Sequence, residues 1–401
     1  MARRTQGLTV LIAAVSTLGP YTIDSFFPAL RAIGADLHVS RLQAQQILTA
    51  FMLPYAFMSL VHGSLSDALG RRGLILAALA VYTVASLGCA LAPGFGTLLL
   101  FRALQGMVAG TGQTIGRAVV RDCYHGVQAQ RVMSSITMIF ALGPALAPII
   151  GGWVHVWFGW RAVFGTMALF GALLLLAVWI RLPETHPPQK RTPLHLGALA
   201  GNIVHVMADR RFQWMIGSSV LCLISLHAYI GSAPAIVLDH WHLSETQFGM
   251  LTIPIIGGYS LGAYFSGKSA GRIEPERVIR WGYHGTLAIS ALMLALQYLV
   301  PHPPVFVQQL LLAAMAAAVQ FIFPVVTLRI LELFPQARGA ASSAQAFFSM
   351  IMSAVMMGVV SPWLSIDLQR MALGCFATTV TGWLLWYAKL RQPPGQPGEI
   401  R

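Results

Sequence analysis

The sequence predicts an all-α membrane protein with twelve transmembrane helices in two six-helix bundles. Hydrophobic residues make up 56% of its 401 residues and charged residues only 10%, whereas a soluble domain carries about a quarter charged residues. Apolar runs of about twenty residues, long enough to cross a bilayer as a helix, recur along the whole chain. This composition excludes both a soluble globule and a disordered chain.

Twelve such runs are present, and most connections between them are short. The first six cover residues 8–30, 45–65, 74–92, 97–118, 132–153 and 161–181, and the second six cover 213–236, 248–267, 279–299, 305–327, 340–360 and 369–388. The longer connection between the sixth and seventh runs is polar and rich in proline. We therefore expect a first bundle at 1–181, a cytoplasmic linker at 182–212, a second bundle at 213–388 and a cytoplasmic tail at 389–401. Two halves with equal numbers of spans are typical of transporters built by internal duplication.

The distribution of basic residues predicts the orientation. Of the 26 Lys and Arg residues, 21 fall on one side of the predicted spans, four on the other, and Arg102 lies within a span. By the positive-inside rule, we expect both termini to be cytoplasmic. We expect a multi-pass protein of the cell inner membrane. The formal net charge of +13 thus reflects topology, and we expect no nucleic-acid partner.

Two charged residues lie well inside predicted spans, Asp24 in the first and Arg102 in the fourth. With a rise of 1.5 Å per residue, both are roughly 7 to 9 Å below the outer boundary. The two side chains can therefore form an ion pair or face each other across a water-filled cavity. A purely structural salt bridge is the alternative. We favour a proton-coupling site, because charges inside a membrane are costly and a buried carboxylate responds to desolvation, to a nearby cation and to bound substrate.

The connection after the second span reads GSLSDALGRRGLIL, from Gly63 to Leu76. It resembles the loop signature of the major facilitator superfamily, which implies the major facilitator fold. The alternative is a loop that only anchors the topology. We expect a conformational latch that closes the cytoplasmic side, formed by Gly63, Asp67, Gly70, Arg71 and Arg72.

The fourth span, LLLFRALQGMVAGTGQTIGRAVVRD, carries Arg102, Gln105 and Gln113 among several glycines. The string resembles the fourth-span motif of the superfamily, in which the arginine takes part in proton coupling. The fifth span, ALGPALAPIIGGW, resembles the motif of the antiporter branch, which points to efflux. Its glycines and prolines, which bend the helix and let it pack tightly, are Gly143, Pro144, Pro148, Gly151 and Gly152.

The strings IDSFFPAL, GRAVVRDCYHGVQAQRVMS and FPQARGAASSAQAFF are similar to the Bcr/CflA group of drug:proton antiporters, related to bicyclomycin and chloramphenicol exporters. This resemblance implies multidrug efflux, antibiotic resistance and a monomer. One departure is that residues 11–23 of the first span contain no second acidic residue, so we expect neutral or zwitterionic substrates rather than cations.

Other polar residues in the spans are candidates for the wall of a substrate cavity. Ordinary hydrogen bonding between helices is the alternative for each of them. The candidates are Tyr21, Gln105, Gln113, His227, Tyr229 and Gln320.

The leading interpretation is proton-coupled export of small amphipathic compounds by alternating access. The first rival is a proton-coupled importer of a small nutrient on the same fold, and a passive channel is another. An enzyme is not expected, since the sequence has no HExxH string and no paired aspartates within its predicted spans. The proton gradient, not ATP, is the expected energy source, and neither a cofactor nor a metal site is expected. The partners are the lipid bilayer, protons and a small-molecule substrate.

Overall fold

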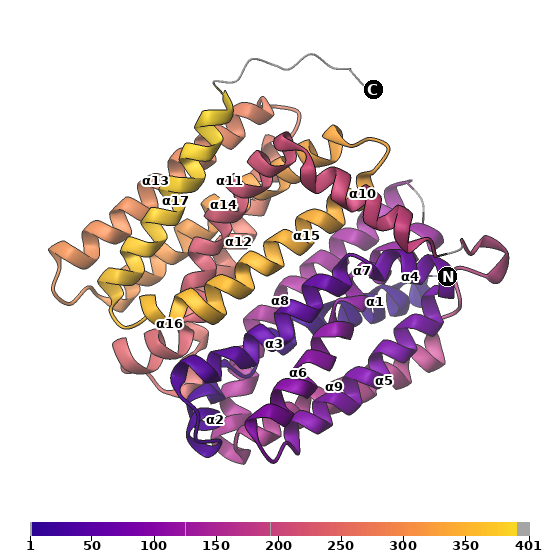
Figure 1. Cartoon of the computed structure of the whole chain (residues 1–401), viewed down its shortest axis with the longest axis horizontal. Helices are drawn as coiled ribbons and strands as arrows, with labels where there is room; N and C mark the ends of the chain where they lie inside the picture. The colour runs from indigo at the N-terminus through magenta and orange to yellow at the C-terminus, as the bar shows by residue number, and fades with distance from the viewer. Residues whose placement is uncertain (1, 125, 193, 391–401) are drawn as a thin grey trace.

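The computed structural model describes residues 2–124, 126–192 and 194–390, and the described part of the chain is almost entirely helical (Figure 1). The prediction for the tail falls largely on residues 391–401, which lie outside the described residues. The predicted fold class is confirmed: this is an all-α membrane protein.

The first half of the chain, coloured indigo to magenta in Figure 1, contains the helices that cover the first six predicted spans. They are α1 (Ala2–Asp24), α2 (Leu30–Asp36), α3 (Arg41–Ser59), α4 (His62–Leu69), α5 (Arg71–Ala90), α6 (Phe95–Ala109), α7 (Thr111–Cys123), α8 (Gly126–Phe158) and α9 (Trp160–Arg181), with the 3₁₀ turn η1 (Phe27–Ala29) between α1 and α2.

The second half covers the last six predicted spans. Its helices are α11 (Arg210–Gly231), α12 (Gly249–Ser269), α13 (Pro275–Leu299), α14 (Val305–Leu333), α15 (Arg338–Val355), α16 (Ser361–Leu364) and α17 (Leu368–Leu390), with the π-helices η3 (Ala235–His240) and η5 (Met356–Val360) and the 3₁₀ turn η4 (Glu245–Gln247).

Several spans are interrupted rather than straight. The first span breaks after Asp24 and continues through η1, where Pro28 lacks the backbone N–H that a continuing helix requires. The second span bends by 56° between α3 and α4. The fourth is divided at Gly110, between α6 and α7. These breaks interrupt the regular helix beside Asp24 and within the glycine-rich fourth span.

By length and composition, eight helices of the described chain are long and apolar enough to cross a membrane, and the bent pair α3–α4 would make a ninth. The other three predicted spans also fall on helices, namely α6 with α7, α8 and α13.

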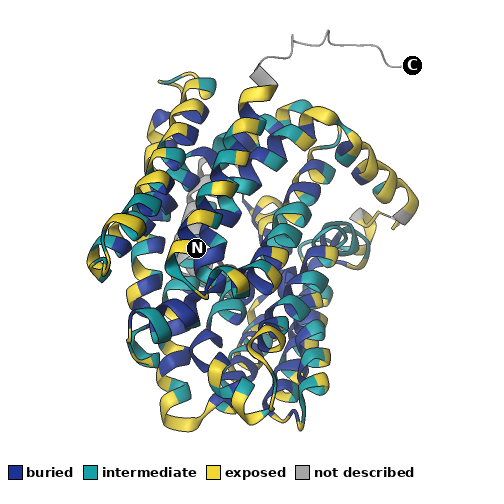
Figure 2. Cartoon of the chain, turned by 60° about the vertical axis from the view of Figure 1, so that its left-hand side comes forward, coloured by how far each residue is buried: buried dark blue, intermediate teal, exposed yellow. Residues whose placement is uncertain are grey.

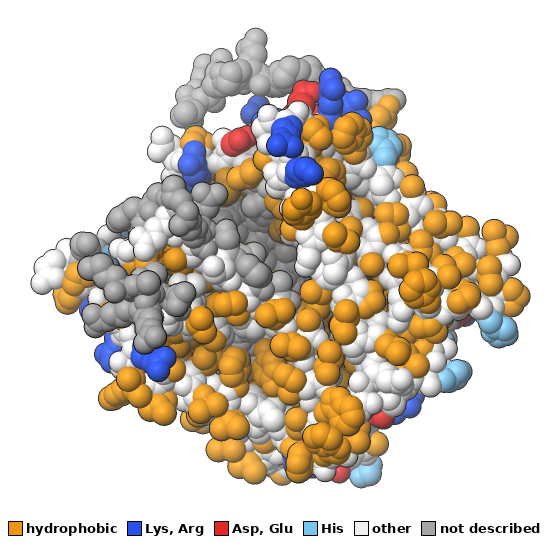
Figure 3. Space-filling model, turned by 180° about the vertical axis from the view of Figure 1, so that it is seen from behind, with side chains coloured by type: hydrophobic (Ala, Val, Ile, Leu, Met, Phe, Trp, Pro, Cys, Tyr) orange, Lys and Arg blue, Asp and Glu red, His pale blue; other side chains and the backbone are white. Residues whose placement is uncertain are grey.

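Large apolar side chains are exposed on the outer surface, including Trp179 at 66% and Leu299 at 79%. Burial follows the inward faces of the helices (Figure 2). Apolar side chains form a broad belt over the face in Figure 3, and charged groups gather near its edges. Because exposed apolar surface of this extent needs lipid, the chain is an integral membrane protein.

Each half packs mainly within itself. In the first half, α1 packs on α8, α3 on α6 and α5 on α9, whereas in the second half α12 packs on α14 and α11 on α17. Between the halves, α3 lies against α15 and α8 against α12. We call the end of the molecule that carries Arg71 and Lys268 the basic end, and the end that carries Arg31 and Arg161 the opposite end.

The linker differs from the expected polar connection in one respect. It contains a helix, α10 (Leu196–Ala208), in the apolar stretch LGALAGNIVHVMA. Ile203 and Val206 of this helix are buried, and the helix packs on α15 and α11. The second part of the linker therefore folds onto the second half.

Candidate functional site

Asp24 is the last residue of α1 and is half-buried. Within the described part of the chain, its carboxylate has no hydrogen-bond or ion-pair partner. Tyr259 of α12, in the other half, is close enough to interact with it electrostatically. The predicted proton-coupling carboxylate thus stands at a helix break, unpaired, and faces the second half.

Arg102 of α6 is fully buried and does not pair with Asp24 in this structure. Its Nε donates to the carbonyl oxygen of Ile47 at 3.2 Å and its Nη1 to Oε1 of Gln105 at 2.9 Å. Nη2 has no partner among the described residues. The sequence places Asp24 and Arg102 at the same depth, but the arginine points to α3 and Gln105 instead.

Three phenylalanine rings surround the Arg102 guanidinium, and we call them the aromatic cage. The guanidinium carbon lies 4.6 Å from the ring centre of Phe26, 4.6 Å from that of Phe51 and 5.9 Å from that of Phe164. A cation over a ring face is attracted by the ring quadrupole, and most strongly where water is excluded. The cage therefore stabilises the buried cation in place of a carboxylate.

All three cavity candidates of the first half form contacts within that half. The Tyr21 hydroxyl lies 3.3 Å from Thr166 Oγ1, and Gln113 accepts a hydrogen bond from Tyr55 at 3.2 Å. Gln105, besides binding Arg102, donates to Ser86 at 2.7 Å. Interhelical hydrogen bonding therefore accounts for these groups in the present state.

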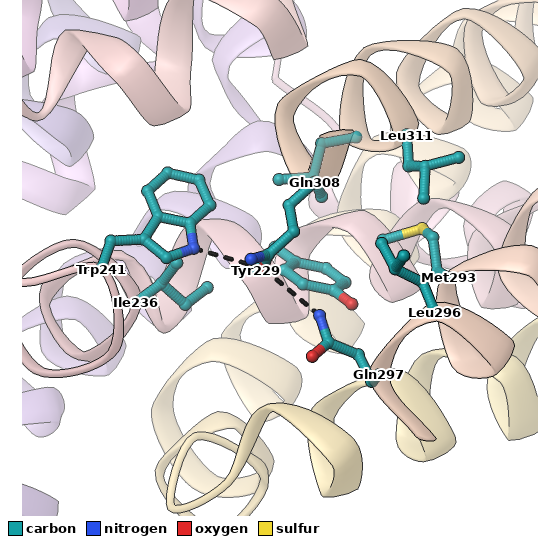
Figure 4. A pocket seen from close by; sticks show the side chains of 9 residues that line it. Tyr229, Ile236, Trp241, Met293, Leu296, Gln297, Gln308 and Leu311 are labelled. Atoms are coloured by element: carbon teal, nitrogen blue, oxygen red, sulfur yellow. Dashed lines mark hydrogen bonds between the residues drawn. The ribbon is translucent and has the colours of Figure 1, made fainter. Parts of the chain in front are cut away.

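The candidates of the second half lie apart from one another. His227 of α11 is half-buried, and its Nδ1 lies 2.7 Å from Ser353 Oγ of α15. Gln320 is half-buried on α14. Tyr229 instead lines a small pocket inside the second half, with Trp241, Gln297 and Gln308 (Figure 4). Gln308 accepts hydrogen bonds there from the Trp241 indole and the Gln297 amide, both at 3.2 Å. Tyr229 thus belongs to a pocket within the second half.

The glycines of the fifth span permit close backbone contacts. Gly143 packs on the Thr17 side chain, Gly151 on the backbone oxygen of Ser25, and Gly152 on the backbone of Glu245 in the second half. Pro144 and Pro148 lie inside the uninterrupted helix α8. Gly151 therefore allows α8 to approach the chain immediately after Asp24, where any larger side chain would collide.

At the basic end, Arg71 is buried and is the centre of a cluster of ionic contacts. It pairs with Asp67 at 2.6 Å and with Asp122 at 3.2 Å. Gly70 adopts φ +94°, a conformation that favours glycine. The predicted latch residues Asp67 and Arg71 are thus brought together within the first half.

The carboxylate of Glu184, just after α9, accepts hydrogen bonds from the backbone N–H groups of Arg71 and Arg72. An anion at this helix N-terminus is favoured by the helix dipole. Sequence reasoning missed Glu184 and Asp122, although Asp122 ends the quoted fourth-span string. Gly63 meets only the Thr114 methyl at an ordinary 3.9 Å, so close approach does not require glycine there.

Polar contacts between the two halves gather at the opposite end. Asp239 of η3 forms ion pairs with Arg31 and with Arg41, the latter at 3.1 Å. Gln45 donates to the carbonyl oxygen of Gly231, and Gln46 to that of Gly358, both at 2.9 Å. Gly358 also packs directly on the Thr49 side chain. The halves are thus tightly joined at this end.

A helical bundle that spans the membrane, with an unpaired carboxylate at a helix break that faces the other half, is the arrangement of a membrane transporter, not an enzyme. Residues 9–357 match the Major Facilitator Superfamily. The chain belongs to this superfamily.

Relatives of known sequence agree with this assignment. An uncharacterized MFS-type transporter, YdgK, of Bacillus subtilis is 28% identical over 97% of this chain and 96% of its own length. A bicyclomycin resistance protein homolog of Haemophilus influenzae is 28% identical over 67% of this chain and 68% of its own. Multidrug resistance protein D of Escherichia coli is 27% identical over 66% of each.

Solved structures support the fold. A D-xylose–proton symporter superimposes with a TM-score of 0.68 at 14% identity, covering 95% of this chain and 97% of its own. A bacterial homolog of the human lysosomal transporter Spinster gives 0.71 at 17% identity, covering 96% and 95%.

Proposed function

We propose that this transporter exports small amphipathic drugs or metabolites across the inner membrane in exchange for protons. The observation that carries the proposal is Asp24, an unpaired half-buried carboxylate at a helix break that faces Tyr259 of the other half. The names of the bicyclomycin resistance and multidrug resistance relatives support export of drugs.

The chemistry of the site follows from competition for one carboxylate. A proton neutralises Asp24. The ionised carboxylate can bind a hydrogen-bond donor of the substrate, or it can stay free while a neutral substrate binds the apolar walls of the site. Arg102 keeps a positive charge in the same half, which disfavours cationic substrates. Neutral or zwitterionic compounds therefore fit the site best, with one proton entering for each molecule exported.

Alternating access explains the asymmetry of contacts between the halves. We infer that residues 1–181 and 213–388 move as two bodies about the site, with 182–212 as the linker and the basic end facing the cytoplasm. The ion pairs of Asp239 close the opposite end. At the basic end, the described ion pairs of Asp67 and Arg71 stay within the first half. This asymmetry supports a state open to the cytoplasm, with the latch engaging the second half in the other state.

The test uses purified protein in liposomes with an imposed pH gradient and radiolabelled chloramphenicol as the neutral probe. Export is supported if the probe accumulates against its gradient only when protons flow the opposite way. Uptake in the same direction as protons would support the nutrient importer instead. Flux that is independent of the gradient, with currents beyond carrier turnover, would support a channel. Failure with chloramphenicol is followed by a growth screen of a deletion strain against antibiotics, dyes and metabolites, which identifies the substrate.

A further inference from the structure

Arg102 is a buried cation without an acidic partner in the described chain, and this makes its surroundings unusual. An unpaired charge in a membrane interior requires compensation. Here the compensation consists of two hydrogen bonds, to Ile47 and Gln105, and the aromatic cage. Because Nη2 has no partner among the residues described, one guanidinium donor is uncommitted. The aromatic cage thus determines which acceptors this free nitrogen of Arg102 can reach.

The three cage residues come from three different segments, and they differ in their relation to Asp24. Phe51 belongs to α3 and Phe164 to α9. Phe26 stands in the break of the first span, two residues after Asp24, and is fully buried. It is therefore the cage residue that shares a segment with the proton site.

We propose that Phe26 is a positioning residue that couples the charge of Asp24 to Arg102. The proposal rests on the proposed function, in which Asp24 carries the proton. A carboxylate at the C-terminus of α1 is disfavoured when ionised, because the helix dipole is negative there. Neutral Asp24 leaves the helix end, Phe26 and the cage intact. Ionisation favours rearrangement of the break, which moves the Phe26 ring and releases Arg102 toward the carboxylate.

Phe26 also fixes how tightly Asp24 holds its proton. With the cage intact, Arg102 is held away from Asp24, and the neutral acid is favoured. Without the Phe26 ring, the guanidinium is freer to pair with the ionised carboxylate, which favours loss of the proton. Removing the ring should therefore lower the pH at which Asp24 is half-protonated.

The test measures protonation of Asp24 directly, without a substrate. Full-length protein in liposomes is treated with dicyclohexylcarbodiimide, which modifies protonated carboxyl groups in apolar surroundings, over a range of pH. The modified peptide that contains Asp24 is quantified by mass spectrometry. Asp24→Asn identifies the signal by abolishing it. We expect Phe26→Leu to lower the labelling midpoint by about 1 pH unit, and Phe26→Tyr, which keeps the ring, to restore it.

Phe212→Leu is the matched control, because Phe212 of α11 is 1% exposed and is not among the rings that lie over Arg102. Its midpoint should equal that of the wild type. In an Arg102→Gln background, Phe26→Leu should have no effect on the midpoint. If Phe26→Leu does not fold, Phe51→Leu removes the other ring at 4.6 Å and should shift the midpoint the same way.

An unchanged midpoint in folded Phe26→Leu protein would overturn the proposal, as would a shift that persists without Arg102. The proposed function fails separately, if wild-type protein shows no gradient-driven export while the labelling shifts remain.

Discussion

Arg41 and Asp239 lie in different halves of the chain and form an ion pair of 3.1 Å. Arg31 binds the same carboxylate, so two cations of the first half converge on one anion of the second. The side chains are 51% exposed for Arg41 and 30% for Asp239, and exposed pairs contribute about 0–1 kcal/mol each. These pairs can therefore bias the equilibrium between states without locking it.

We expect Asp239→Asn to increase the population open at the opposite end by a few-fold, because both pairs are lost together. Spin labels on His38→Cys and His242→Cys, in a cysteine-free background, would report longer distances. Asp36→Asn is the matched control, since Asp36 at the same end pairs with Arg161 of its own half at 2.7 Å. An identical distance distribution for Asp239→Asn and wild type would contradict the closing role.

Asp24→Asn should abolish gradient-driven export while preserving expression and folding, because the amide cannot bind and release a proton at this site. Counterflow without a gradient should persist, since it needs substrate exchange alone. The measurement is export from proteoliposomes of equal protein content, with Asp36→Asn as a carboxylate control outside the span. Robust proton-driven export by Asp24→Asn would rule out the assignment.

Exchange of one proton for one neutral molecule moves a net positive charge inward in each cycle. Export should therefore respond to the membrane potential by about 2.3 kcal/mol per 100 mV, as well as to the pH difference. Vesicles clamped with potassium and valinomycin provide the measurement. Export of a neutral substrate that ignores the potential, or efficient export of divalent cations, would show that the single-carboxylate scheme is wrong.

Asp67→Asn should reduce turnover more than substrate binding and leave thermal stability nearly unchanged, because Arg71 keeps Asp122 and Ser66 as partners. Arg71→Ala should instead destabilise the protein by about 3 kcal/mol or more, since it leaves Asp122 without its buried cation. Thermal unfolding in detergent and transport kinetics separate the two effects. Equal destabilisation by both variants would indicate that Asp67 stabilises the folded protein and does not act as a conformational latch.

The opposite end should weaken in acid. Hydrogen bonds from Arg161 and Trp160 lower the pKa of Asp36 below its usual value. A carboxylate whose pKa is lower in the folded state stabilises that state above its unfolded pKa and loses this effect as the pH falls through the folded pKa. Thermal unfolding of the wild type should therefore fall more steeply with acid than that of Asp36→Asn. Parallel pH profiles would contradict this.

The sequence predicted the helical spans well, because a bilayer requires long apolar helices and each run reports its own length. It also predicted that Asp24 and Arg102 fall in helices of the first half. It could not predict that they point apart, since helix rotation is set by tertiary packing, here the rings of Phe26 and Phe51. The contact of Glu184 with the start of α5 could not be predicted for the same reason, because it depends on where the linker runs after α9.

The attachment of the linker at both ends has a mechanical consequence. Glu184 ties its start to the first turn of α5 in one half, and α10 ties its later part to α11 and α15 in the other. The chain from Glu184 to Leu196, fully extended, reaches at most about 40–43 Å. This segment is therefore a tether of limited length. Its covalent geometry sets an upper limit on the angle by which the two halves can separate on that side.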